Sequence, residues 1–121
     1  MNEKKALSKV KEVYCSSIFK DKVKAWKKHY VVTQQLSVPL GLIKVVLFDD
    51  REESTTYKKI NEVIIGNSNY VRLTIPPNIW YGFKSCFSST SLLVNTPDGL
   101  HDPNEAEIMN VEQSLIPYSW E

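Results

Sequence analysis

The sequence has few of the residues that build metal centres and disulfide frameworks, with two cysteines and two histidines among 121 residues. Two cysteines are too few for the disulfide framework of a small secreted domain. The chain also lacks a paired-cysteine zinc spacing, a glycine-rich phosphate loop and a Gly-x-Ser-x-Gly nucleophile motif. Cys15 and Cys86 lie among strand-forming residues, and we predict that both are reduced and mostly buried.

Long apolar runs and an excess of one charge are missing as well. No apolar stretch approaches the roughly 18 residues of a membrane span, and the lysine-rich residues 1–11 lack the apolar run of a signal peptide. The formal charge is +1, from 15 basic and 14 acidic side chains, whereas nucleic-acid-binding domains usually have a strong basic excess. We therefore expect a cytoplasmic protein with no nucleic-acid partner and no membrane partner.

What the chain does contain is a series of short segments rich in β-branched and aromatic residues, separated by turn residues. Eight or so strands at intervals of about 8–12 residues indicate a β-sandwich or a β-barrel. We expect one domain over residues 1–121, with an N-terminal extension or edge segment, a barrel, and a tail that is apolar enough to dock (1–11, 12–107 and 108–121). The only helical feature that we expect is a turn at residues 1–10. The predicted strands are residues 12–19, 23–29, 30–38, 42–48, 57–65, 70–75, 80–86 and 91–96.

Three motifs distinguish between these folds. His29 and Gly41 have the spacing of the first cupin motif, in which Lys27 stands at the first histidine and Gln34 at the glutamate. Residues 41–54 end in Asp-Asp-Arg-Glu-Glu-Ser, and residues 73–83 contain Ile-Pro-Pro-Asn-Ile-Trp-Tyr-Gly-Phe. Both stretches, together with residues 92–98 and the acidic turn 101–105, are similar to segments of dTDP-4-dehydrorhamnose 3,5-epimerases.

The chain thus resembles the RmlC-like epimerases and the related sugar 3,4-ketoisomerases over about residues 23–107. The resemblance implies an all-β cupin jelly-roll barrel, a homodimer, and a substrate site in the barrel mouth. The implied substrate is a nucleotide-linked 4-keto-6-deoxyhexose of surface-polysaccharide synthesis. A cupin that binds a sugar nucleotide without turning it over is the alternative from another functional class.

Epimerisation beside a ketone requires a base, a group that stabilises the enolate, and an acid. The resemblance places the base at His29, the lysine of the family at Gln34 and its tyrosine acid at Val94, which carries no proton to transfer. The histidine before Gly-Phe is replaced by Tyr81, and we hypothesise that Tyr81 supplies the missing phenol. The aspartate that orients the base in the family has no clear counterpart here.

Several further side chains are candidates for binding the substrate. Lysines commonly bind phosphate, and strand alternation predicts that Lys28 shares one face with Lys24 and Trp26, and that Lys27 shares the other with His29. A solvated strand face is the alternative for this basic run. Other candidates are Arg51 and Arg72 for phosphate, and Trp80 for stacking on a ring.

A metal site is not expected at the cupin positions. Cupin sites typically use three histidines and a carboxylate, and the corresponding set here is Lys27, His29, Gln34 and Tyr81. One imidazole is too few for a transition metal, so we predict no metal and no cofactor. His101 is expected to be a surface turn residue.

Overall fold

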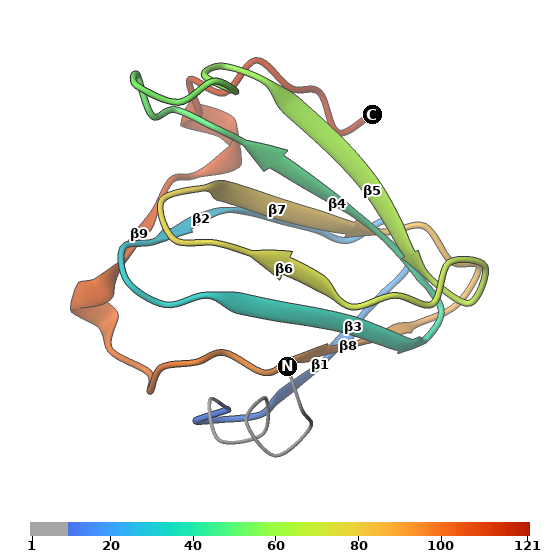
Figure 1. Ribbon diagram of the computed structural model, residues 1–121. Helices are drawn as coiled ribbons and strands as arrows, with labels where there is room; N and C mark the ends of the chain where they lie inside the picture. The colour runs from blue at the N-terminus through green and yellow to red at the C-terminus, as the bar shows by residue number, and fades with distance from the viewer. Residues whose placement is uncertain (1–9) are drawn as a thin grey trace.

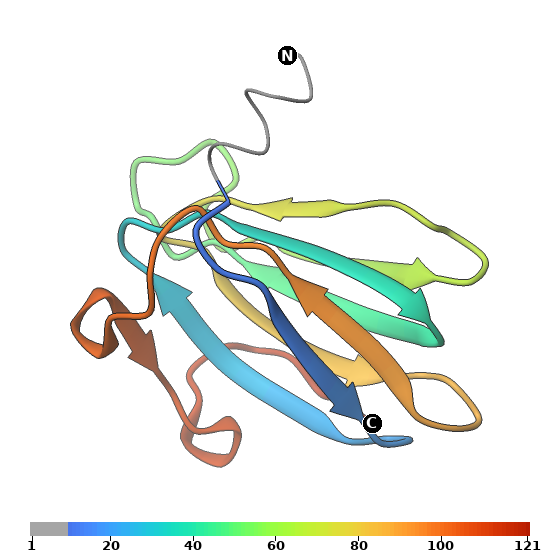
Figure 2. The same ribbon diagram turned by 90° about the horizontal axis from the view of Figure 1, so that it is seen from below.

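A computed structural model describes residues 10–121 of the chain, so the turn predicted at residues 1–10 lies almost wholly outside the described residues. The described part consists of two facing antiparallel sheets (Figures 1 and 2). The smaller sheet has the order β1-β8-β3-β6, and the larger has the order β5-β4-β7-β2-β9. The strands are β1 Tyr14–Ile18, β2 Val23–His29, β3 Gln34–Leu40, β4 Leu42–Phe48, β5 Ile60–Gly66, β6 Leu73–Ile75, β7 Trp80–Ser85, β8 Ser91–Asn95 and β9 Ala106–Ile108.

The all-β fold is confirmed, and every predicted strand corresponds to an observed one. The strands at 23–29 and 42–48 have the predicted bounds, and the other six have shifted ends. Two short 3₁₀ helices, η1 Pro103–Glu105 and η2 Val111–Gln113, complete the described elements. The third strand begins at Gln34, four residues later than predicted, because the loop before it folds around a carboxylate described below. No helix within residues 10–121 is long and apolar enough to cross a membrane.

The main core lies between the two sheets. The inward-facing side chains of β4, Ile43 and Val45, are fully buried there against Leu36, Val38 and Ile75 of the smaller sheet. The apolar run of β4 is buried on both faces, because a second cluster covers its outer side. The hydrophobic effect thus fixes β4 at the centre of the molecule.

The second core lies on the outer face of the larger sheet. The C-terminal segment packs Ile116, Tyr118 and Trp120 against Trp26 and Val46. The backbone carbonyl of Trp120 also accepts a 2.9 Å hydrogen bond from Lys84 Nζ. The prediction that the tail docks is therefore confirmed for these residues.

A β-bulge interrupts β2 and decides which lysines face inward. Lys24 pairs with Phe83 and Lys27 with Tyr81, so one extra residue of β2 is inserted opposite Gly82. Gly82 has no room for a side chain, since a Cβ atom there would lie 2.4 Å from that of Ala25. The bulge resets the alternation of β2, and both lysines line the same cavity. The prediction that they lie on opposite faces was wrong.

Both cysteines are free, but both are exposed, so the prediction that they are mostly buried was wrong. Cys15 lies on β1, an edge strand whose Tyr14 and Ser16 face the cavity, and alternation turns Cys15 to the other side. Cys86 follows the last residue of β7.

Candidate functional site

A cavity of about 500 Å³ opens between the two sheets at one end of the molecule. This volume lies in the usual range of small-molecule sites. The larger sheet contributes polar side chains from β2 and β7, and the smaller sheet contributes side chains from β1, β3 and β8. The loop of residues 97–105 closes one side. The polar and basic residues of the two sheets in its lining are Tyr14, Ser16, Lys24, Lys27, His29, Gln34, Tyr81 and Asn95.

His29, the last residue of β2, is hydrogen bonded through both ring nitrogens. Its Nδ1 contacts Glu105 Oε1, and its Nε2 lies 3.3 Å from the hydroxyl of Tyr81. The side chains of His29 and Glu105 are only 13% and 14% exposed. Because Glu105 accepts, Nδ1 carries the proton, and Nε2 keeps a lone pair that faces the Tyr81 hydroxyl.

Glu105 is held as an anion. Its Oε2 accepts hydrogen bonds from the backbone N–H groups of Tyr30, Val31 and Val32, at 3.1, 3.0 and 3.1 Å. Burial alone would raise the pKa of this carboxyl, but the bonds from His29 and from the backbone outweigh it and hold the pKa below its usual value. Glu105 therefore fixes the ring orientation of His29.

Tyr81 is buried beside this pair, with 8% of its surface exposed. Burial, and then the negative charge of Glu105, raises the pKa of Tyr81 well above its ordinary value. The phenol is therefore protonated throughout the physiological range and can donate its proton to His29 Nε2 or to a ligand.

An amide pair lines the opposite wall. Gln34 of β3 is 2% exposed, and its Oε1 accepts a hydrogen bond from Asn95 Nδ2 of β8. The Nε2 group of Gln34 has no hydrogen-bond partner among the described residues.

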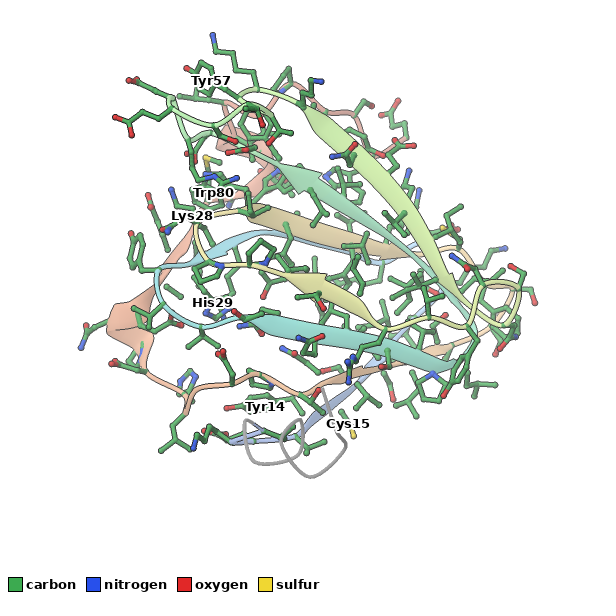
Figure 3. All side chains as sticks on the ribbon, in the orientation of Figure 1. Tyr14, Cys15, Lys28, His29, Tyr57 and Trp80 are labelled. Atoms are coloured by element: carbon green, nitrogen blue, oxygen red, sulfur yellow. The ribbon has the colours of Figure 1, made fainter. Side chains whose placement is uncertain are left out.

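Four of the eight predicted site residues line this cavity: Lys27, His29, Gln34 and Tyr81. Lys28 points elsewhere, and its Nζ lies 3.4 Å from Asp50 and 4.9 Å from the ring centre of Trp80. Figure 3 shows Lys28 and Trp80 side by side at one level and His29 apart from them. Trp80 is packed in the outer core and donates to Asp50 through its indole N–H, at 2.8 Å.

The two predicted arginines also lie outside the cavity lining. Arg51 forms a paired contact with the carboxylate of Asp49, through Nε and one terminal nitrogen, each at 2.9 Å. Arg72 is exposed just before β6. His101 is exposed, as expected of a turn residue, and nevertheless borders the cavity.

Val94 does not line the cavity, whereas its neighbours Leu93 and Asn95 do. The phenols that reach the cavity from the described residues belong instead to Tyr14 and Tyr81. Among residues 10–121, no three histidine, cysteine, aspartate or glutamate side chains form a group that could hold a metal ion. The absence of a metal stays a prediction.

Sequence reasoning missed several polar contributors to the site, namely Tyr14, Ser16, Lys24, Asn95 and Glu105. Lys24 was assigned to the other face because a bulge has no signature in single-strand alternation. Glu105 lies 76 residues from His29. Its only local signal is the turn before it, where Asp102 caps η1 by accepting from Asn104 N–H at 2.9 Å.

Comparison with known proteins gives related sequences and folds. No family model matches the chain. A "Probable low-salt glycan biosynthesis epimerase Agl13" from Haloferax volcanii is 35% identical over 106 residues, which are 87% of this chain and 65% of that protein. The chain thus spans about two thirds of the length of this curated relative.

Solved structures agree with this match. A dTDP sugar isomerase from Desulfovibrio desulfuricans is 40% identical, with a TM-score of 0.86 over 92% of this chain and 71% of that one. The RmlC epimerase of Legionella pneumophila, in complex with dTDP-4-keto-L-rhamnose, is 16% identical and has a TM-score of 0.80 over 99% and 68% of the two chains. The second match shows the fold alone, whereas the first is close enough in sequence to show kinship. The chain therefore has the cupin jelly-roll fold and belongs to the RmlC-like family of dTDP-sugar epimerases and isomerases.

Proposed function

We propose that this protein moves a proton on the carbon beside the keto group of a nucleotide-linked 4-keto-6-deoxyhexose, with His29 as the base. The observation that carries the proposal is the position of His29 between an ionised Glu105 and a protonated Tyr81, at the wall of a cavity large enough for a sugar. The related isomerase and epimerase support the substrate class.

The arrangement of His29 suits the first chemical step. Once the substrate displaces the Tyr81 hydroxyl from Nε2, the lone pair of Nε2 takes the proton from the carbon next to the carbonyl, and the electron pair of the broken C–H bond moves onto the carbonyl oxygen as an enolate. Nδ1–H stays bonded to Glu105, whose negative charge stabilises the imidazolium that forms. The same step begins an epimerisation or a ketoisomerisation.

Lys24 and Lys27 are the cationic candidates for the diphosphate. The bulge in β2 brings both into the cavity lining on the same strand as His29. Lysine binds phosphate oxygens as a point charge and tolerates variation in their positions. The sugar would then lie between His29 and the facing sheet, with the diphosphate directed toward the lysines.

The source of the returning proton separates two activities. Tyr81 lies on the same sheet as His29 and returns a proton from the same side, which suits a sugar 3,4-ketoisomerase. Tyr14 lines the cavity from β1 of the facing sheet and suits an epimerase, which needs its acid on the opposite face. In Figure 3, Tyr14 lies at the lower edge of the molecule, away from His29. Loss of product formation in Tyr14→Phe with retained activity in Tyr81→Phe would favour the epimerase, and the reverse pattern the isomerase.

The proposal is tested by incubating the protein with dTDP-4-keto-6-deoxyglucose in D₂O and following deuterium incorporation into the sugar by NMR. A general base contributes about 10²–10⁴-fold, so we expect His29→Asn to lose at least 10²-fold in exchange while still binding dTDP. Thermal unfolding of the variant controls for folding. Binding of the sugar nucleotide without exchange by the wild-type protein would refute catalysis and favour the non-catalytic alternative.

We further propose a homodimer and a role in surface-polysaccharide synthesis, both on the basis of family resemblance, and a cytoplasmic location. Light scattering coupled to size-exclusion chromatography tests the dimer directly.

A further inference from the structure

Gln34, a residue of the cavity lining, has a buried hydrogen-bond donor with no partner among the described residues. Its side chain is 2% exposed, so water at the surface does not solvate it. One end of the amide is used, since Oε1 accepts from Asn95 Nδ2. The other end, Nε2, is itself buried and has no partner among residues 10–121, and Gln34 belongs to the cavity lining. A buried donor of this kind is costly unless a ligand satisfies it, so the position points to an acceptor on the substrate.

The direction of the Gln34 amide is fixed by a chain of hydrogen bonds that begins at the backbone. The N–H of Gln35 can only donate, and it donates to Asn95 Oδ1 at 3.2 Å. Asn95 therefore turns its NH₂ group toward Gln34, and Gln34 accepts this hydrogen bond through its side-chain oxygen. The NH₂ group of Gln34 is left without a partner among the described residues, in a side chain that belongs to the cavity lining. The positions of the oxygen and nitrogen of this amide are thus set by the backbone N–H of Gln35, which can donate a hydrogen bond but cannot accept one.

We propose that Gln34 Nε2–H binds the carbonyl oxygen that becomes the enolate, and that Asn95 is the positioning residue that holds it in this sense. This inference rests on the proposed function. His29 is on β2 of the larger sheet and Gln34 on β3 of the facing sheet, so the sugar lies between base and donor. The proton leaves carbon for His29, the electron pair reaches the oxygen, and Gln34 donates a hydrogen bond without losing its proton.

A neutral NH₂ group can donate a hydrogen bond to the lone pairs of a carbonyl or enolate oxygen. The donor is already oriented before the substrate arrives, which is the condition for a large electrostatic effect in the transition state. Loss of one such donor typically reduces kcat by about 10²–10³-fold.

Asn95→Asp is the sharpest test, because it reverses the direction of the hydrogen bond between residues 95 and 34 while the side chain keeps its shape. A carboxylate still accepts from Gln35 N–H, but it can no longer donate to Gln34. Gln34 is then expected to turn its NH₂ toward Asp and its oxygen toward the cavity. We expect kcat for deuterium exchange to fall about 10²-fold or more with a smaller change in KM. Asn61→Asp, on the exposed side of β5, is the matched control and should keep wild-type exchange.

The orientation is read independently of activity by NMR of the ¹⁵N-labelled Gln34 side chain. In the wild type, dTDP-4-keto-6-deoxyglucose should shift the Gln34 NH₂ resonances, whereas dTDP alone should leave them unchanged. Gln34→Met identifies the signals by removing them and should lose exchange as Asn95→Asp does.

The outcomes separate this inference from the function on which it rests. If His29→Asn abolishes exchange but folded Asn95→Asp and Gln34→Met stay within about threefold of wild type, the Gln34 assignment is wrong and the base assignment survives. If wild-type protein shows no exchange, the catalytic proposal fails. The NMR signals of Gln34 then test whether it binds the sugar. A shift with the keto sugar supports Gln34 as the donor to its oxygen, and no shift overturns that role.

Discussion

Substitution of Glu105 by glutamine should disable His29 while leaving the loop around it folded. Oε2 of Glu105 accepts three backbone N–H groups, from Tyr30, Val31 and Val32, and only an oxygen can do this. In Glu105→Gln the amide oxygen is therefore expected to stay with the backbone, and the NH₂ group to face His29 Nδ1. Nδ1 must then accept, so the proton of the neutral ring moves to Nε2. The nitrogen that faces Tyr81 loses the lone pair with which it would act as a base.

The expected magnitudes follow from this geometry. A wrong tautomer at a catalytic histidine costs about 10⁴-fold in kcat in a serine protease with a comparable carboxylate–histidine pair, and we expect about 10³–10⁴-fold here. Stability should fall less, because two to three backbone bonds survive. Loss of the charge weakens charge-assisted bonds worth roughly 1.5–3 kcal/mol each, which predicts a decrease of about 2 kcal/mol in the free energy of unfolding.

The pH dependence gives this prediction a second readout. The folded-state pKa of Glu105 is lowered, so its contribution to stability is complete above the unfolded pKa near 4.3 and is lost as the pH falls through the folded value. The difference in Tm between wild type and Glu105→Gln should therefore be largest near neutrality and should shrink toward pH 3. Deuterium exchange and thermal unfolding measure the two effects. A Glu105→Gln variant that exchanges at the wild-type rate would show that the carboxylate does not set the tautomer of His29.

Two further predictions concern the bulge in β2. Lys24→Met and Lys27→Met should each weaken binding of dTDP about tenfold in isothermal calorimetry, with Lys22→Met, outside the cavity, as the matched control; equal effects of all three substitutions would exclude a specific phosphate contact. Gly82→Ala should reduce the free energy of unfolding by about 1–3 kcal/mol, because its Cβ would lie 2.4 Å from that of Ala25 and 2.8 Å from Trp120 Cζ2. Chemical denaturation measures this loss, and an unchanged midpoint would mean that the bulge can open at little cost.

The sequence predicts the fold well where local pattern and burial agree. The apolar run of β4 is buried on both faces in the structure, and Gly41 adopts φ +97° at the turn before it, where the motif places glycine. β9 has no pattern of its own. It is three residues long and forms because residues 106–108 pair with Lys27, Lys28 and His29. Such strands depend on their partner and cannot be found by inspecting their own sequence.

The site is less predictable because its central contacts join distant segments. His29 and Gln34 are found through motif spacing, whereas Glu105 and Asn95 take their roles only from the way the chain folds back. Lys24 shows a related limit, since one inserted residue on β2 reverses the faces of the side chains beyond it. Family spacing therefore locates the proposed base, and the hydrogen-bond network identifies the groups that orient its ring.

The network also gives a reason why the chain can replace a charged family residue with an amide. Gln34 is only 2% exposed, so a lysine at this position would have to bury its charge. Burial lowers the pKa of an amine, because it disfavours the charged form. Gln34 avoids that cost, but a free amide could present either end to the substrate. Asn95 removes this freedom, because its own orientation is set by a backbone N–H. In the proposed mechanism, a neutral donor with a fixed direction thus replaces the cation. This replacement requires Asn95 as much as it requires Gln34.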